Sequence, residues 1–423
     1  MSEIKIAETS FKLFTLSNGM RLVHQEIASP VAYCSLVINT GSRDELVNEH
    51  GVAHLVEHLM FKKTGKRKAH HILSRMENVG GEINAYTTKE DTCIHSAFLN
   101  THYERALELF KDIVFNHKIT DKILQLEKSV VIDEIKSSKD NPTDLIFDEF
   151  DNLLFLNHPL GRSTLGTPQS VNKLNIIDLE RFVERNYLPN RMVISSVGNI
   201  SFKRLIDYVE KYFCAIPCQG SKTLTGLRTA PTEYVSFQKE INKRNHQSHC
   251  IIGTSCKYPA GRVGEGSERE FRIAMAMLSN LLGGPGMNTR LNMSLRERYG
   301  WVYHVEASYT PYSDVGVFQI YFASDRSKIE KCMQQIEKEI DLLKKNPLTK
   351  EQLRKLQLQM MGQLAIASDN NDARMLSAGK SMLMFNKIEP LHDICTQINK
   401  VSAERLCEIA NKVFTDFSVL KHH

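Results

Sequence analysis

The stretch Gly51-Val-Ala-His-Leu-Val-Glu-His-Leu-Met-Phe61 decides how this chain is interpreted. Its apolar residues recur at helical spacing, which predicts a helix that faces a core. On such a helix His54 and His58 stand four residues apart on one face, so their ring nitrogens can bind a single Zn²⁺. Glu57 projects toward the same side, where it can take a proton from a metal-bound water. This order, with the glutamate before the second histidine, is the inverted zinc motif.

The motif needs a third ligand, because the chain has 16 histidines and two helix histidines can equally be one core residue and one solvated residue. A candidate lies on the helix predicted over 121–139. There Glu127 and Glu134 are seven residues apart, close to two full turns, and share a face with apolar neighbours. The alternative, two solvated glutamates on a charged surface, applies to most such pairs.

Composition narrows the class of protein. At 423 residues the chain is too long for one ordinary core, so two domains are expected. With 42% hydrophobic and 24% charged residues it is typical of a globular protein, and a net charge of +5 gives no reason to expect nucleic acid. Nine cysteines without framework spacing indicate a reducing compartment. No apolar leader or membrane-length segment is evident, so we expect a cytoplasmic protein that does not bind membranes.

The two halves of the chain show a similar order of elements. Strands are predicted in the first half within 11–26 (a hairpin around Asn18-Gly19) and at 31–40, 82–88, 92–98 and 192–198. Helices are predicted at 69–79, 103–115, 121–139 and 202–213, and another that starts near Ser170 lies within 167–187. A linker is predicted at 217–222. In the second half, strands are predicted at 235–240, 249–254, 302–309 and 315–323, and helices at 268–282, 329–343, 350–366, 373–384 and 403–413.

The helix predicted over 268–282 occupies the position in the second half that the helix of His54 and His58 occupies in the first, but it has no pair of histidines. We therefore expect an α+β fold of two homologous domains, each a mostly antiparallel sheet packed with helices. The expected domains are 1–220, which carries the metal site, and 230–423, which has none.

A hairpin in the first half is a candidate peptide-binding edge. Gly80-Gly81 precedes the strand over 82–88, and a glycine pair there lets another backbone approach closely. Asn84 and Ala85 then offer edge amides and carbonyls to an extended peptide. The segment by itself is equally explained as an ordinary edge hairpin.

At Glu134 the motifs together resemble a known family. His54-x-x-Glu57-His58, followed by Glu134 after 76 residues, resembles the pitrilysin/insulinase zinc metallopeptidases, and the length matches the two-domain type of mitochondrial processing peptidase and its bacterial relatives. The resemblance covers essentially the whole chain. Its further markers are Gly80-Gly81 with Asn84-Ala85, Glu127, Asp133-Glu134-Ile135 with Asp140-Asn-Pro142, Gly283-Gly284, and Arg296 with Tyr303.

The resemblance implies a role for each matching residue. It implies that His54, His58 and Glu134 hold one Zn²⁺ per chain and that Glu57 is the general base. By the same resemblance Glu127 is a supporting carboxylate. Asn84 and Ala85 would bind the substrate backbone, and Arg296 and Tyr303 would bind substrate and stabilise the tetrahedral intermediate.

The implied activity is that of a zinc-dependent endopeptidase for unfolded peptides or short polypeptides, with a Glu57-activated, zinc-bound water as nucleophile. In the family the arginine–tyrosine pair comes from the half opposite the zinc. We therefore expect a homodimer in which Arg296 and Tyr303 of one subunit complete the site of the other. Two alternatives remain: a non-hydrolytic partner or scaffold subunit of a related peptidase, and a dedicated precursor-maturation peptidase. Subunits of the first kind lack part of the zinc set, whereas this chain keeps all four residues.

Overall fold

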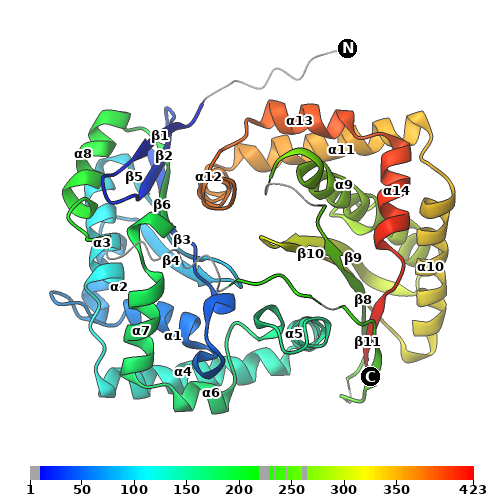
Figure 1. The fold of residues 1–423 in the computed structure, drawn as a ribbon, viewed down its shortest axis with the longest axis horizontal. Helices are drawn as coiled ribbons and strands as arrows, with labels where there is room; N and C mark the ends of the chain where they lie inside the picture. The colour runs from blue at the N-terminus through cyan, green and yellow to red at the C-terminus, as the bar shows by residue number, and fades with distance from the viewer. Residues whose placement is uncertain (1–9, 219–227, 233, 244, 260–263) are drawn as a thin grey trace. The chain divides into compact units, whose positions relative to one another are not determined.

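A computed structural model describes residues 10–218, 228–232, 234–243, 245–259 and 264–423, which form two compact units (Figure 1). The first comprises Met1–Ser137, Arg162–Arg228 and Ala367–Pro390, and the second comprises Ser138–Gly161, Thr229–Ile366 and Leu391–His423. The expected domains, 1–220 and 230–423, are each continuous in sequence, whereas each unit includes one segment from the other half. Most of the predicted linker, residues 219–222, lies outside the described residues.

A six-stranded sheet forms the centre of the first unit. Its strands are β1 (Lys12–Thr15), β2 (Arg21–Glu26), β3 (Val31–Ile38), β4 (Glu82–Thr87), β5 (Thr92–Leu99) and β6 (Met192–Gly198), in the order β1-β2-β6-β3-β5-β4. Among these six described strands, only β2 and β6 pair in parallel. The predicted Asn-Gly hairpin is confirmed: Gly19 has a φ of 86°, in the left-handed region that a tight turn requires.

Helices cover both faces of this sheet. On one face a large apolar core joins the sheet to most of the helices that come from the first half, and Leu22, Leu36 and Ile94 are among its strand residues. These helices are α1 (Val52–Met60), α2 (Ala69–Glu77), α3 (Tyr103–Phe115), α4 (Asp121–Asp140), α6 (Pro168–Lys173), α7 (Ile176–Asn186) and α8 (Phe202–Phe213). On the other face Val23 and Val193 pack against α12 (Asn371–Phe385), which comes from the second half of the chain.

The second unit is built on a five-stranded sheet. Its strands are β7 (Gln238–Ile241), β8 (Ser248–Lys257), β9 (Val302–Pro311), β10 (Val315–Ser324) and β11 (Ser418–His422), in the order β7-β11-β8-β10-β9. One face packs on helices of the second half: α9 (Gly266–Gly283), α10 (Ile329–Lys345), α11 (Lys350–Asp369), α13 (Leu391–Lys400) and α14 (Ala403–Val413). The opposite face packs on α5 (Pro142–Leu154), which comes from the first half.

The two sheets share one strand arrangement. In each, the last strand of the sequence lies between the first and second of the matching set, parallel to the first and antiparallel to the second: β6 between β2 and β3, and β11 between β7 and β8. This confirms the predicted α+β fold with mostly antiparallel sheets. Each sheet also receives one helix from the other half of the chain.

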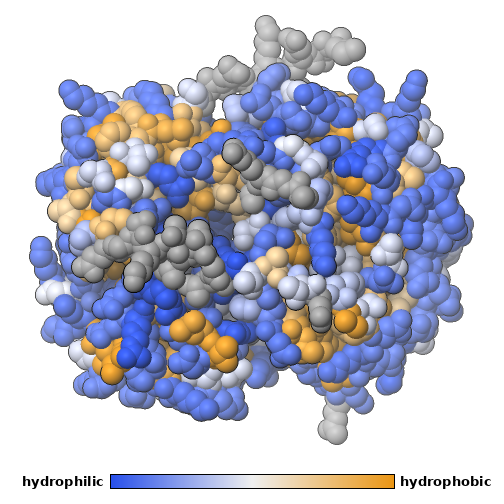
Figure 2. Space-filling model, in the orientation of Figure 1, coloured by the Kyte–Doolittle hydropathy of each residue, from blue (hydrophilic) through white to orange (hydrophobic). Residues whose placement is uncertain are grey.

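The structure differs from the predicted elements in a few places. The helices α5 and α13 and the strand β11 are not among the predictions. The single helix predicted within 167–187, starting near Ser170, is two helices, α6 and α7. Asn175 caps the second by accepting a hydrogen bond from the Asp178 amide. Among the described residues, no helix is long and apolar enough to cross a membrane. On the face shown in Figure 2, hydrophilic side chains predominate and apolar ones form separate patches.

Candidate metal centre and active site

The helix α1 that carries the two histidines is held firmly at its first turn. Gly51 precedes it with a φ of 92°, and a Cβ there would lie 3.0 Å from the Leu165 carbonyl oxygen, so glycine is required. The carboxyl group of Glu45 accepts hydrogen bonds from the backbone amides of Gly51 and Ala53, both at 3.0 Å. These bonds satisfy amide groups that a helix start leaves without partners. Leu55, like the rest of the core-facing side, is fully buried.

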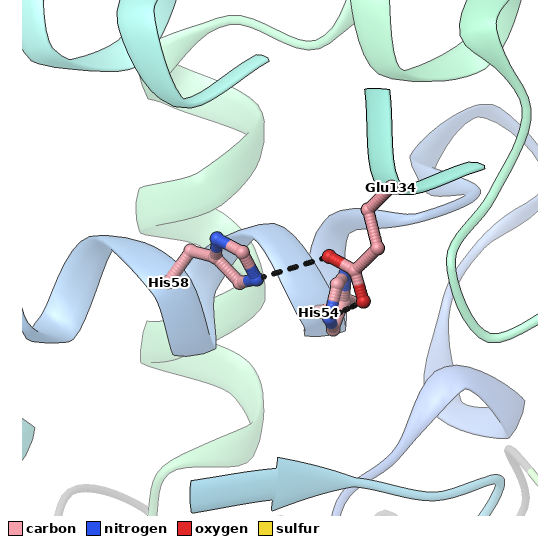
Figure 3. Close-up of side chains that lie close together, drawn as sticks. All are labelled: His54, His58 and Glu134. Carbon is pink, nitrogen blue, oxygen red and sulfur yellow. Dashed lines mark ion pairs between the residues drawn. The ribbon is translucent and has the colours of Figure 1, made fainter. Parts of the chain in front are cut away.

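His54, His58 and Glu134 come together as predicted (Figure 3). His54 Nε2 lies 3.7 Å from Glu134 Oε1, and His58 Nε2 lies 3.5 Å from Glu134 Oε2. All three donor atoms lie within 4.8 Å of one another. The group forms because α4 brings Glu134 over the face of α1 that carries both rings.

The donor set fits a zinc ion. Ligand atoms at tetrahedral corners 2.0–2.1 Å from zinc are about 3.3 Å apart, close to the separations between Glu134 and the two histidines. Burial and the neighbouring His58 lower the pKa of His54 to about 4, so its ring is neutral near pH 7, as a ligand must be. The contact with Glu134 raises the pKa of His58 and lowers that of Glu134. Two histidines and one carboxylate leave a coordination position for water or substrate.

Glu57 lies on the same helix, with its side chain largely buried (9% exposed). Burial raises the pKa of Glu57, which makes it a better proton acceptor, and a hydrogen bond from Thr87 opposes that shift. The Thr87 hydroxyl donates to Glu57 Oε2 at 2.5 Å. Thr87 is not among the predicted site residues, because this contact joins a helix to the end of a strand 30 residues away.

Glu127 is nearly inaccessible (2% exposed) and lies behind His58. Its Oε2 is 3.5 Å from His58 Nδ1 and 3.0 Å from Lys62 Nζ. A carboxylate beside the non-coordinating nitrogen of a ligand histidine fixes the orientation of that ring. Lys62 is also not among the predicted site residues, although its position four residues after His58 places it on the same side of the helix end.

The remaining predicted residues lie in two places. Asn84 and Ala85 are on β4, the last strand at one edge of the first sheet, and Asn84 is exposed. Arg296 and Tyr303 belong to the second unit, where the Arg296 guanidinium lies 5.7 Å from the centroid of the Tyr303 ring. Tyr303 is 83% exposed.

Comparison with known proteins gives a consistent result. Residues 21–168 match the family model described as insulinase (peptidase family M16), and residues 173–360 match the peptidase M16 inactive domain. The zinc protease YmxG of Bacillus subtilis is 31% identical over 406 residues, covering 96% of each chain. A zinc protease of Mycobacterium leprae is 30% identical over 407 residues, covering 94% of this chain and 88% of its own.

A solved structure shares the fold. A protease from Helicobacter pylori superposes with a TM-score of 0.90 at 20% identity, covering 98% of this chain and 99% of its own. The inactive-domain match agrees with the second half of the chain, where no cluster of potential metal ligands occurs among the described residues. With a His-His-Glu site in its first half and relatives alike over nearly their whole length, the chain belongs to the insulinase family, peptidase family M16, whose metal is zinc.

Proposed function

We propose that this protein is a zinc-dependent endopeptidase that hydrolyses unfolded peptides or short polypeptides. The observation that carries the proposal is the convergence of His54, His58 and Glu134 with the Glu57 carboxylate on the same helix as both histidines. A site of three protein ligands with an adjacent carboxylate suits hydrolysis, because it combines an electrophilic centre with a proton acceptor.

Each residue of the proposed site has its own role in the reaction. Zinc bound by His54, His58 and Glu134 would supply Lewis acidity toward the peptide carbonyl and the attacking water. Glu57 takes the proton of that water as it attacks, and then gives the proton to the leaving amine. Its raised pKa favours the first of these transfers. Glu127 holds the orientation of His58 from behind the ligand set.

Substrate binding is assigned to the edge strand. An extended peptide pairs with the backbone of Asn84 and Ala85 on β4, which has no neighbour on its outer side within the first sheet. Such pairing recognises the backbone of the substrate rather than its side chains, which suits peptides that are already unfolded. All nine cysteines are free, which supports a reducing compartment, and we propose the cytoplasm.

The direct test replaces the base and keeps its shape. Glu57→Gln lowers the rate of peptide cleavage about a hundredfold or more, with the zinc content unchanged. Glu77→Gln, an exposed position on α2, is the matched control and leaves the rate unchanged. Removing zinc with a chelator abolishes cleavage by the wild-type protein, and adding zinc back restores it. Full activity of Glu57→Gln would reject the mechanism.

We also propose that the protein is a homodimer in which Arg296 and Tyr303 act on the site of the other subunit. A complementation experiment tests this directly. Glu57→Gln and Arg296→Ala are each inactive, and mixing them after subunit exchange restores about a quarter of wild-type activity, since half of the dimers are mixed and each has one intact site. If Arg296 acts within its own chain, or the protein is monomeric, mixing restores nothing.

A further inference from the structure

Thr87 connects the proposed base to the proposed substrate strand. It is the last residue of β4, and its hydroxyl donates to Glu57 Oε2 at 2.5 Å. We propose that Thr87 is a positioning residue, which holds one oxygen of Glu57 so that the other, Oε1, receives the proton of the attacking water. This inference rests on the proposed role of Glu57 as the general base.

The Thr87 hydroxyl restricts the rotation of the Glu57 carboxylate about its terminal torsion. The terminal torsion of a glutamate side chain has a broad, shallow energy profile, so an unrestrained carboxylate rotates easily. A hydroxyl-to-carboxylate hydrogen bond of this length is charge-assisted and among the stronger kinds. Threonine suits the task because its branched Cβ restricts its own first torsion. The donor is therefore as well fixed as the strand that carries it.

That strand end is itself fixed by the loop 41–49, which we call the clamp loop. The backbone amides of Ser42 and Arg43 donate to the carbonyl oxygens of Thr88 and Lys89, at 3.1 and 2.8 Å. The approach is so close that a Cβ on Gly41 would overlap the Thr88 carbonyl oxygen. The turn that follows Thr87 thus lies directly against the clamp loop.

The clamp loop also holds α1. Glu45 accepts the amide hydrogens of Gly51 and Ala53 at the start of that helix, as described above. A buried ion pair between Arg43 and Glu90, at 2.6 Å, joins the loop to the turn by side chains as well. The loop therefore contacts both the turn after Thr87 and the helix of Glu57, so it fixes the distance between donor and base.

The hydrogen bond between Thr87 and Glu57 links the proposed substrate strand to the proposed base. The strand assigned to bind the substrate backbone ends at the residue that orients the base. A peptide paired with β4 and the Glu57 carboxylate thus share one rigid frame. Correct placement of a reacting group within such a frame contributes to the rate, rather than to the affinity for substrate.

The test uses three substitutions of Thr87. Thr87→Val removes the hydroxyl at constant shape, Thr87→Ser keeps the hydroxyl, and Thr87→Ala removes hydroxyl and bulk together. Thr15→Val, at the exposed end of β1, is the control for a threonine-to-valine change at a strand end. For each variant kcat, KM and the zinc dissociation constant are measured, and the melting temperature shows that the chain is folded.

We expect Thr87→Val to lower kcat about tenfold to a hundredfold, with KM and zinc affinity within about threefold of wild type. Thr87→Ser retains most of kcat, and Thr87→Ala behaves like Thr87→Val. In the Glu57→Gln background, Thr87→Val has no further effect on the residual rate, because the group that it positions is gone.

Three results would overturn the inference: a wild-type kcat for a folded Thr87→Val, a loss that serine does not rescue, or an equal loss in the Glu57→Gln background. The proposed function fails by a different result, namely full activity of Glu57→Gln itself. The two failures are therefore distinguished within one set of variants.

Discussion

The carboxyl group of Glu45 provides a prediction about the stability of α1. Glu45 is 4% exposed and accepts two backbone hydrogen bonds at the start of α1. Glu45→Gln preserves the size of the side chain, but it offers one oxygen acceptor where the carboxyl group of Glu45, protonated or not, offers two. Its amide nitrogen, a donor, must face the other backbone N–H. One buried N–H left without an acceptor costs about 1–3 kcal/mol in the free energy of unfolding.

The free-energy cost of Glu45→Gln depends on pH, and the shifted pKa of Glu45 determines in which direction. Burial raises the pKa of Glu45 from 4.5 to about 8, although the two amide hydrogen bonds oppose the shift. The folded chain therefore holds the proton more tightly than the unfolded chain. The stability that this contributes is full below pH 4.5 and is lost as pH rises to 8. Its upper limit over that interval is about 5 kcal/mol.

The glutamine variant has no such titration, so the comparison isolates Glu45. We expect the advantage of wild type over Glu45→Gln to be largest near pH 5 and to shrink toward pH 9. The assay is urea unfolding of chelator-treated protein across this range, followed by circular dichroism, with Glu77→Gln as an exposed control. A difference that is constant with pH would show that Glu45 does not titrate there. A difference that grows with pH would show that the charged carboxylate is the stabilising form.

Two further changes test the ligand set and the exchanged helix. Glu134→Gln removes the charge of the third ligand, so we expect zinc affinity in a competitive chelator titration to fall about a hundredfold or more, and unchanged affinity would exclude Glu134 as a ligand. Gly379→Ala places a Cβ 2.9 Å from Val37 Cγ2 and 3.1 Å from Ser195 Cβ, beneath α12. It should lower the free energy of unfolding by about 1–3 kcal/mol, whereas a stabilising effect would show that α12 has room to move.

The parts of the site that lie close together in sequence follow from helical periodicity. The spacing of His54, Glu57 and His58 is enough to place three side chains on one side of a helix. Helical periodicity alone does not identify Glu134 as a ligand, because nothing in its own helix distinguishes a metal ligand from a solvated glutamate. The resemblance to a family provides that distinction. Thr87 had no signal of its own, since its position depends on how a strand end packs on a loop and a helix.

The missed elements have a similar cause. The helix α5 has local signals: Asn141 caps it and Pro142 occupies its first turn, while Ile146 and Phe150 are one helical turn apart. In the sequence, Asp140-Asn-Pro142 serves only as a marker of the family resemblance, so no helix is predicted there. The strand β11 has little signal, because five residues at the end of the chain have no hairpin partner. Its neighbours, β7 and β8, precede it by more than 150 residues.

The exchange of helices changes what counts as a folding unit in this chain. In the first half taken alone, Val23 and Val193 on the second face of the sheet lack the α12 side chains that cover them in the structure. The same holds for Ile251 and Tyr321 in the second half without α5. Exposing such apolar faces costs about 25 cal/mol per Å² and favours association. A cut near 220 therefore divides the sequence but leaves each core open. The candidate zinc site belongs to a unit that is complete only when both halves of the chain are present.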